Sequence, residues 1–180
     1  MKTAPRVMIL FPNTGNDGVM PLAVGILSAI AKDAGCEVCY VETTFYNKSN
    51  TATEDHEYTG EFRAVKGRKK SEYPSLQNFY VDFKDALSLF HPDVLAVHAN
   101  SLEWELFKKI MENVRLPEPS PFVIVGGVHA TIDSDSVMAE PFVDAVCLGE
   151  GEDAWAGLVR AICDGNEVSE DKVLEVWRRA

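Results

Sequence analysis

Apolar runs and helical patterns alternate along the chain. Apolar residues follow one another almost without interruption, as expected of strands buried on both faces of a parallel sheet, in residues 6–11, 36–42, 93–97, 122–125 and 145–148. Segments with the pattern and end signals of helices follow each run, at residues 21–34, 79–90, 101–114, 131–139 and 150–163. This alternation predicts an α/β fold.

Punctuating residues support the helix boundaries. Pro21 lies in the first turn of the first predicted helix, and Gly35 comes just past its end. Ser101 is a candidate cap for the third helix, with Glu103 and Glu105 favourably placed in its first turn.

The strand count predicts the architecture. Five strands separated by helices in a chain of 180 residues favour a doubly wound, flavodoxin-like (Rossmann-like) three-layer sandwich, with a five-stranded parallel sheet in the order 2-1-3-4-5. Ligands of such sheets bind beyond the carboxyl ends of the strands. We therefore expect a site built from loops 12–20, 98–101, 126–130 and 149–151.

One connection breaks this rhythm. Residues 43–78 form a link far longer than the usual length of about 2–6 residues. We interpret it as a surface excursion, with a hairpin turning at residues 66–68; a flap or partner contact is the alternative. We expect residues 1–165 to form one domain. Residues 166–180 end without a turn or cap and resemble the start of a linker towards an absent catalytic domain.

Charge and composition exclude several classes of protein. The chain carries 28 acidic and 17 basic side chains, for a formal net charge of −11, which disfavours a nucleic-acid partner. It contains no apolar run long enough for a membrane span and no signal-peptide pattern, so we expect a cytoplasmic location. Cys36 and Cys39 are three residues apart in a strand pattern and should face opposite sides, as buried or half-buried thiols.

A paired glycine is the strongest local signal. Gly126 and Gly127 end the fourth predicted strand, where two residues without a Cβ let a bulky ligand approach the backbone. For a glycine pair alone, a tight turn that needs positive φ would be the better explanation. Other short motifs accompany it in a fixed order: PLAVGIL (21–27), AGCEV (34–38), PDV (92–94), GGVHAT (126–131) and GEGE (149–152).

Together these motifs resemble the cobalamin (B12)-binding domain of cobalamin-dependent radical S-adenosylmethionine (SAM) proteins, over residues 6 to about 165. The resemblance implies a corrin above the carboxyl ends of the strands and a nucleotide tail beside the sheet. The cofactor-binding candidates are Asn13, Thr14, Gly15, Asn16, His98, Asn100, Ser101, Leu102, Gly126, Gly127, His129, Gly149 and Glu150. We expect no catalytic residue and no protein metal ligand.

The first loop lacks a histidine. Another branch of cobalamin domains carries D-x-H-x-x-G there, whose histidine binds cobalt, whereas residues 13–18 of this chain read NTGNDG. We therefore expect no cobalt ligand from this loop. His98, at the end of the third strand, could face the corrin, but we interpret both His98 and His129 as hydrogen-bonded structural residues.

The resemblance also implies a larger parent protein. A radical SAM methyltransferase would bind a [4Fe-4S] cluster and SAM through a C-terminal radical SAM domain, and its CxxxCxxC motif is absent from this chain. The present chain would bind a corrinoid without being catalytic alone.

The same fold also serves other functions. A flavodoxin-like FMN-binding electron carrier would use Thr14, Gly15 and Asn16 as a phosphate loop, but Asp17 intrudes there and Trp104 is the only large aromatic near a loop. A receiver domain needs an aspartate after the third strand, and residues 97–100 have none. A degenerate domain that binds no cofactor remains an alternative.

Overall fold

The computed structural model describes residues 4–15, 21–47 and 73–164. The strands are β1 (Arg6–Phe11), β2 (Glu37–Glu42), β3 (Val94–His98), β4 (Phe122–Gly126) and β5 (Ala145–Val146). The helices are α1 (Leu22–Asp33), α2 (Leu76–Phe90), α3 (Ser101–Asn113), α4 (Val128–Ile132), α5 (Ser134–Met138) and α6 (Glu152–Cys163).

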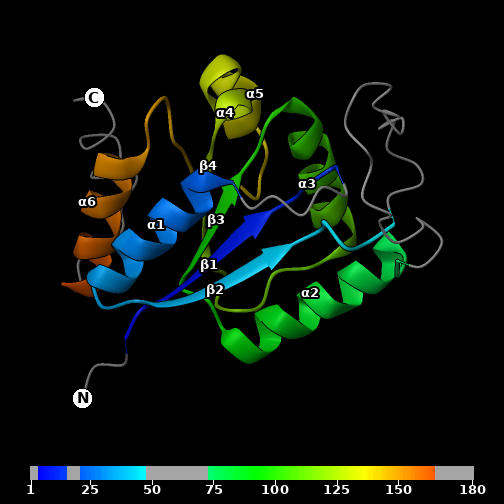
Figure 1. The fold of residues 1–180 in the computed structure, drawn as a ribbon, viewed down its shortest axis with the longest axis horizontal. Coiled ribbons are helices and arrows are strands. Elements are labelled where there is room, and N and C mark those ends of the chain that lie inside the picture. The colour runs from blue at the N-terminus through cyan, green and yellow to red at the C-terminus, as the bar shows by residue number, and fades with distance from the viewer. Residues whose placement is uncertain (1–3, 16–20, 48–72, 165–180) are drawn as a thin grey trace, which may run out of the picture.

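The strands form one parallel sheet in the order β2-β1-β3-β4-β5, as Figure 1 shows. This confirms the predicted flavodoxin-like fold, with the first strand inside the sheet. Parallel strands need crossover connections, and the helices between them supply these. All carboxyl ends of the strands therefore lie at one edge of the sheet.

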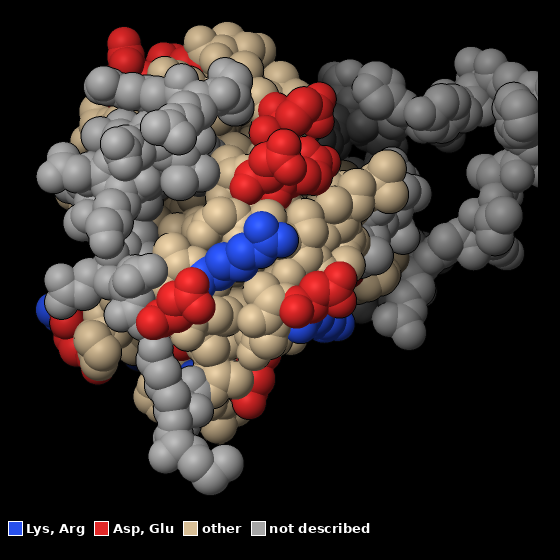
Figure 2. Space-filling model, turned by 90° about the vertical axis from the view of Figure 1, so that its left-hand side faces the viewer, with Lys and Arg blue, Asp and Glu red and all other residues tan. Residues whose placement is uncertain are grey.

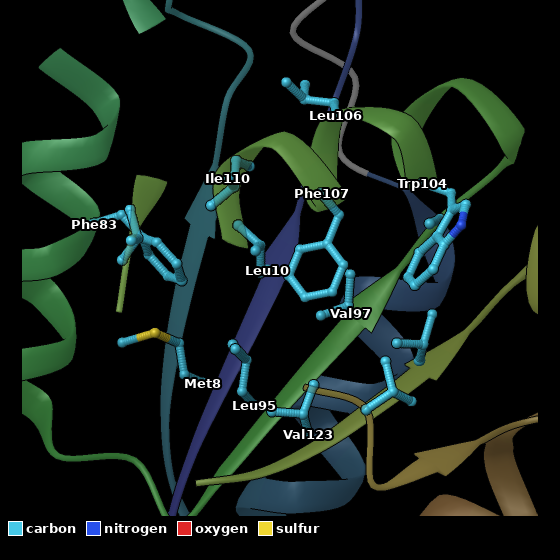
Figure 3. Close-up of a cluster of buried hydrophobic side chains, with 14 of the residues drawn as sticks. Met8, Leu10, Phe83, Leu95, Val97, Trp104, Leu106, Phe107, Ile110 and Val123 are labelled. Atoms are coloured by element: carbon cyan, nitrogen blue, oxygen red, sulfur yellow. The ribbon is translucent and has the colours of Figure 1, made fainter. Parts of the chain in front are cut away.

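Helices cover both faces of the sheet. α2 and α3 pack on one side and α1 and α6 on the other (Figure 1). Because side chains alternate along a strand, each strand feeds two cores. Met8 and Leu10 of β1 join Phe83 and Phe107 in the α2/α3 core (Figure 3), whereas Ile9 of the same strand joins the α1/α6 core.

Cys36 and Cys39 lie on opposite faces, as predicted. Cys36 is buried in the α1/α6 core, while half-buried Cys39 packs against the α2/α3 core. Their sulfurs therefore do not form a pair. Cys36 instead lies 3.6 Å, sulfur to sulfur, from Cys163 at the end of α6.

Two helix starts differ from the prediction because other residues supply the cap. α3 is capped by Asn100, not Ser101: its Oδ1 accepts hydrogen bonds from the N–H groups of Leu102 and Glu103. α2 begins three residues earlier than predicted. There, Ser75 and Asn78 form a reciprocal capping box.

The last third of the chain contains three further corrections. The helix predicted at residues 131–139 is two short helices, α4 and α5, separated at Asp133, whose φ of −137° and ψ of 57° are not helical. β5 ends at Val146 and α6 begins only at Glu152. Gly149, with a φ of 70°, lies in the turn between them.

The ends of the long connection lie next to each other. The Asn47 N–H donates to the Pro74 carbonyl, and the Leu76 N–H donates back to the Asn47 carbonyl. The long connection therefore begins and ends at the same place. The hairpin predicted at residues 66–68 and the linker predicted at 166–180 lie outside the described residues.

Acidic side chains are prominent on the surface, as the negative net charge of the chain leads one to expect. Acidic side chains are spread over the side of the molecule that carries α1 and α6 (Figure 2). Within the described ranges, no helix combines the length and apolar character needed to cross a membrane.

Candidate cofactor-binding site

A cavity of about 390 Å³ opens at the carboxyl edge of the sheet. It lies between the sheet, α1, α4 and α6, and its volume is in the range of small-molecule sites. Its lining residues are Ile9, Ala23, Leu27, Ala96, Val97, His98, Ile124, Gly126, Gly127, Val128, Thr131, Ile132, Cys147, Gly149, Glu150, Gly151, Glu152 and Trp155.

The floor of the cavity consists of two rows of the sheet. Ile9, Ala96 and Ile124 are in register across β1, β3 and β4 and form the inner row. His98 and Gly126, in register two residues further along, form the outer row on the same face. Small side chains in both rows leave space above the sheet.

Two helices form the walls. Ala23 and Leu27 face the cavity from successive turns of α1, and Glu152 and Trp155 do so from α6. Both helices start at the carboxyl edge, so Ala23 and Glu152 lie near the mouth, with Leu27 and Trp155 about one turn deeper. The Trp155 Nε1–H donates to the Leu27 carbonyl at 2.9 Å, and this hydrogen bond joins α6 to α1.

The glycine pair shapes a close contact between two loops. Gly127 has a φ of 104°, and a Cβ built there would lie 2.7 Å from the Ala99 carbonyl oxygen. The Ala99 N–H donates to the Gly126 carbonyl, and the His129 N–H donates to the Ala99 carbonyl. Gly127 thus lines the cavity, and its turn also requires glycine.

Cys147 closes the cavity beside β5. A Cβ on Gly126 would lie 3.2 Å from the Cys147 Cβ, and one on Gly151 would lie 3.1 Å from its Sγ. Burial, with the nearby charge of Glu152, raises the pKa of the Cys147 thiol to about 12. The residue is therefore a neutral wall group at neutral pH.

His98 is a half-buried residue of the cavity. Its ring packs against Phe11, with centroids 6.1 Å apart. Burial lowers its pKa from the ordinary value of 6.5, so the imidazole is neutral at pH 7.

His129 lies outside the cavity lining. Its Nδ1 is 3.1 Å from the Ser101 hydroxyl, and its ring stacks on Trp104 with centroids 5.7 Å apart. Its Nε2 is buried and has no hydrogen-bond partner among the described residues. Trp104 is itself only 2% exposed, so it offers no face for a flavin to stack on, which argues against the FMN alternative.

The first-loop candidates are bonded within the chain. Asn13 is buried; its Nδ2 donates to the Thr44 hydroxyl and its Oδ1 accepts from the Gly15 N–H. Asn16 falls outside the described residues.

The structure brings His98, Gly126, Gly127, Gly149 and Glu150 together around the cavity. The described candidates that do not line it are Asn13, Thr14, Gly15, Asn100, Ser101, Leu102 and His129.

Exposed apolar side chains gather at the same edge. They come from the starts of α1 and α3, from α4 and from the turn after β5, and are Leu22, Leu102, Val128, Ile132 and Leu148, each 48–80% exposed. We call these five residues the apolar rim. Such an exposed set beside a cavity is typical of a surface that a ligand or partner covers.

Most of the apolar lining was missed by the sequence prediction. The predicted candidates lie mainly in loops, whereas the apolar floor comes from the interiors of β1, β3 and β4 and the apolar walls from α1 and α6. The available signal was the alternation along the strands, which places Ile9, Ala96 and Ile124 on one face, with a small alanine among larger neighbours.

Parts of this chain are similar to known proteins. The B12 binding domain family matches residues 75–159, from the start of α2 into α6. An uncharacterized methyltransferase of Pyrococcus horikoshii is 32% identical over 97 residues, which are 49% of this chain and 20% of that protein.

Solved structures agree on the fold. The radical S-adenosylmethionine methyltransferase TsrM from Kitasatospora setae, with tryptophan substrate and a SAM analog bound, superposes with a TM-score of 0.59 at 16% identity, over 92% of this chain and 27% of that one. Its structure with cobalamin and a [4Fe-4S] cluster bound gives 0.56 at 16% identity, over 92% and 26%. The chain thus spans about a quarter or less of these relatives. Residues 75–159 match the family model of the B12 binding domain, and the resemblance predicted from the motifs is confirmed.

Proposed function

We propose that this chain binds cobalamin at the carboxyl edge of its sheet, with the corrin over the apolar rim and the nucleotide tail in the cavity. The observation that carries the proposal is the cavity itself. In a chain that matches the B12-binding domain family, it opens beside Gly126 and Gly127 and runs down between α1 and α6.

The residues present fit such a ligand. Ala23, Ala96 and Gly126 keep the space open where larger side chains would fill it, and a Cβ on Gly126 would crowd that of Cys147 at 3.2 Å. The apolar rim offers the wide corrin a surface that water solvates poorly. The mouth is polar, with Thr131, Glu150 and Glu152.

We propose that cobalt receives no imidazole from the protein. Residues 12–20 contain no histidine, and His98 packs against Phe11 at the cavity. A tail held between α1 and α6 would also keep cobalamin's own base away from the metal.

The chain's own part in any reaction is binding and orientation. Bound cobalamin would supply methyl-carrier chemistry, and the surrounding side chains would fix its tail and shield one face of the corrin. We propose that this domain, residues 1–165, serves a radical SAM methyltransferase whose [4Fe-4S] cluster and SAM are held by another domain. The methyltransferases to which the chain is similar, of which it spans 20% and 27%, support that larger context.

The test is a titration of the purified chain with hydroxocobalamin, followed by visible absorption and equilibrium dialysis. We expect saturable binding of one corrinoid per chain, with a spectrum shifted towards the form whose own base has left cobalt. A chain that retains no corrinoid after dialysis would identify it as a degenerate domain and overturn the proposal.

A further inference from the structure

We propose that the cavity selects the base of the cobamide tail, accepting an apolar aromatic base such as dimethylbenzimidazole and rejecting a purine such as adenine. This inference rests on the proposed function and adds to it the chemical class of the ligand's buried end.

Among the described residues, the inner half of the cavity offers a ligand no side-chain donor or acceptor that is not already hydrogen-bonded. Its floor is Ile9, Ala96 and Ile124, and its walls are Leu27 and Trp155. In the part of the chain that the structure describes, the one side-chain donor there is the Trp155 Nε1–H, which already donates to the Leu27 carbonyl.

The main-chain N–H and C=O groups beneath the cavity are also already hydrogen-bonded. β1, β3 and β4 each pair with strands on both sides, so the ladders use the main-chain groups beneath the cavity. The Leu27 carbonyl lies within α1 and already accepts from Trp155. A base in the inner half would therefore meet mainly carbon.

The two bases differ in what they would bury there. Both carry an imidazole nitrogen that can bind cobalt. Adenine adds an exocyclic amine and two ring nitrogens, whereas dimethylbenzimidazole has a carbon ring with two methyl groups in their place. A polar group buried without a partner loses its hydrogen bonds to water, while buried methyl groups are favourable.

Polar side chains at the mouth cannot hydrogen-bond an adenine base that fills the inner half of the cavity. His98, Glu150 and Glu152 lie at the outer end, about one pleat or one helical turn above the inner residues. A purine that kept its polar edge beside them would leave the inner half of the cavity unfilled. Thr131 is already bonded, since its hydroxyl donates to the Gly127 carbonyl and accepts from the Gly149 N–H.

The experiment compares three corrinoids on the full chain by equilibrium titration: cobalamin, its adenine-containing analogue, and cobinamide, which has no base. We expect cobalamin to bind at least tenfold more tightly than either of the others. Adenine binds cobalt more weakly than dimethylbenzimidazole, so the release of the base from cobalt favours the adenine analogue. A preference for cobalamin must therefore come from the protein.

A matched pair of variants assigns the preference to the cavity. Leu27→Gln places an amide in the inner half and should reduce the ratio of the affinity for cobalamin to the affinity for its adenine analogue. Leu27→Met, which stays apolar, should leave that ratio unchanged. Equal affinities of the unaltered chain for cobalamin and the adenine analogue, or tighter binding of the latter, would overturn the inference while leaving corrinoid binding established. Failure of all three corrinoids to bind would instead overturn the proposed function, and the inference with it.

Discussion

A methyl group on Gly127 would lie 2.7 Å from the carbonyl oxygen of Ala99, closer than side chains approach backbone atoms in proteins. Gly127→Ala should therefore lower the free energy of unfolding more than Gly149→Ala does. Both positions have positive φ, which alone costs about 1–2 kcal/mol for alanine. Of these two glycines, only Gly127 lacks space for a Cβ. Gly127→Ala should therefore lower the free energy of unfolding by about 1–3 kcal/mol more than Gly149→Ala does.

Chemical denaturation of both variants measures this difference. Equal losses would show that the contact with Ala99 relaxes at little cost. The turn would then need glycine only for its backbone conformation.

Filling the cavity mouth should block the cofactor without harming the fold. Ala23→Leu projects a larger side chain from α1 into the cavity, and we expect affinity for hydroxocobalamin to fall at least tenfold. Ala29→Leu makes the same change at an exposed position of the same helix and is the control. Equal affinities of the two variants, measured by absorption titration, would exclude the cavity as the tail site.

His98 makes stability depend on pH in a defined direction. Burial lowers its pKa in the folded chain below the ordinary 6.5, so the unfolded chain binds the proton more readily. This contribution to stability is full above about pH 6.5 and decreases as the pH falls through 6.5 towards the lower folded value. Denaturation curves of the native chain and His98→Gln at pH 7.5 and 5.5 test it. The native chain should lose more stability than the variant, and equal losses would contradict the assignment.

Asn100 should act first as a helix cap. Its Oδ1 accepts from the Leu102 and Glu103 N–H groups, and the Glu103 carboxylate accepts from the Asn100 N–H at 2.7 Å. Asn100→Ala should lower the free energy of unfolding by about 1 kcal/mol, and Asn100→Ser should recover most of it. If Asn100→Ala were as stable as the native chain, the side chain would be available for the corrinoid instead.

The strand pattern was sufficient to predict the fold, because each buried strand is a continuous apolar run and its crossover helix is amphipathic. Boundaries were harder, since caps depend on side-chain geometry. Asn100 and Ser101 are both good capping residues, and only the structure shows that Asn100 accepts the two N–H groups.

The site was only partly predictable for a related reason. Gly126, Gly127, Gly149 and Glu150 carry motif signals and do line the cavity. Leu27 and Trp155 look like ordinary core residues in the sequence, and their role emerges only when α1 and α6 lie side by side. The loss of helical backbone at Asp133 also has no sequence signal as strong as a proline or glycine.

Electron paramagnetic resonance of the Co(II) form of cobalamin bound to the chain tests the central claim most directly. In free cobalamin the nitrogen of its own base splits the cobalt signal into triplets. We predict that the splitting disappears on binding, because the tail enters the cavity and no protein imidazole replaces its base on cobalt. A nitrogen triplet that persists when the chain is in excess would contradict the account. If that triplet also appeared with cobinamide and vanished in His98→Ala, it would identify His98 as the ligand.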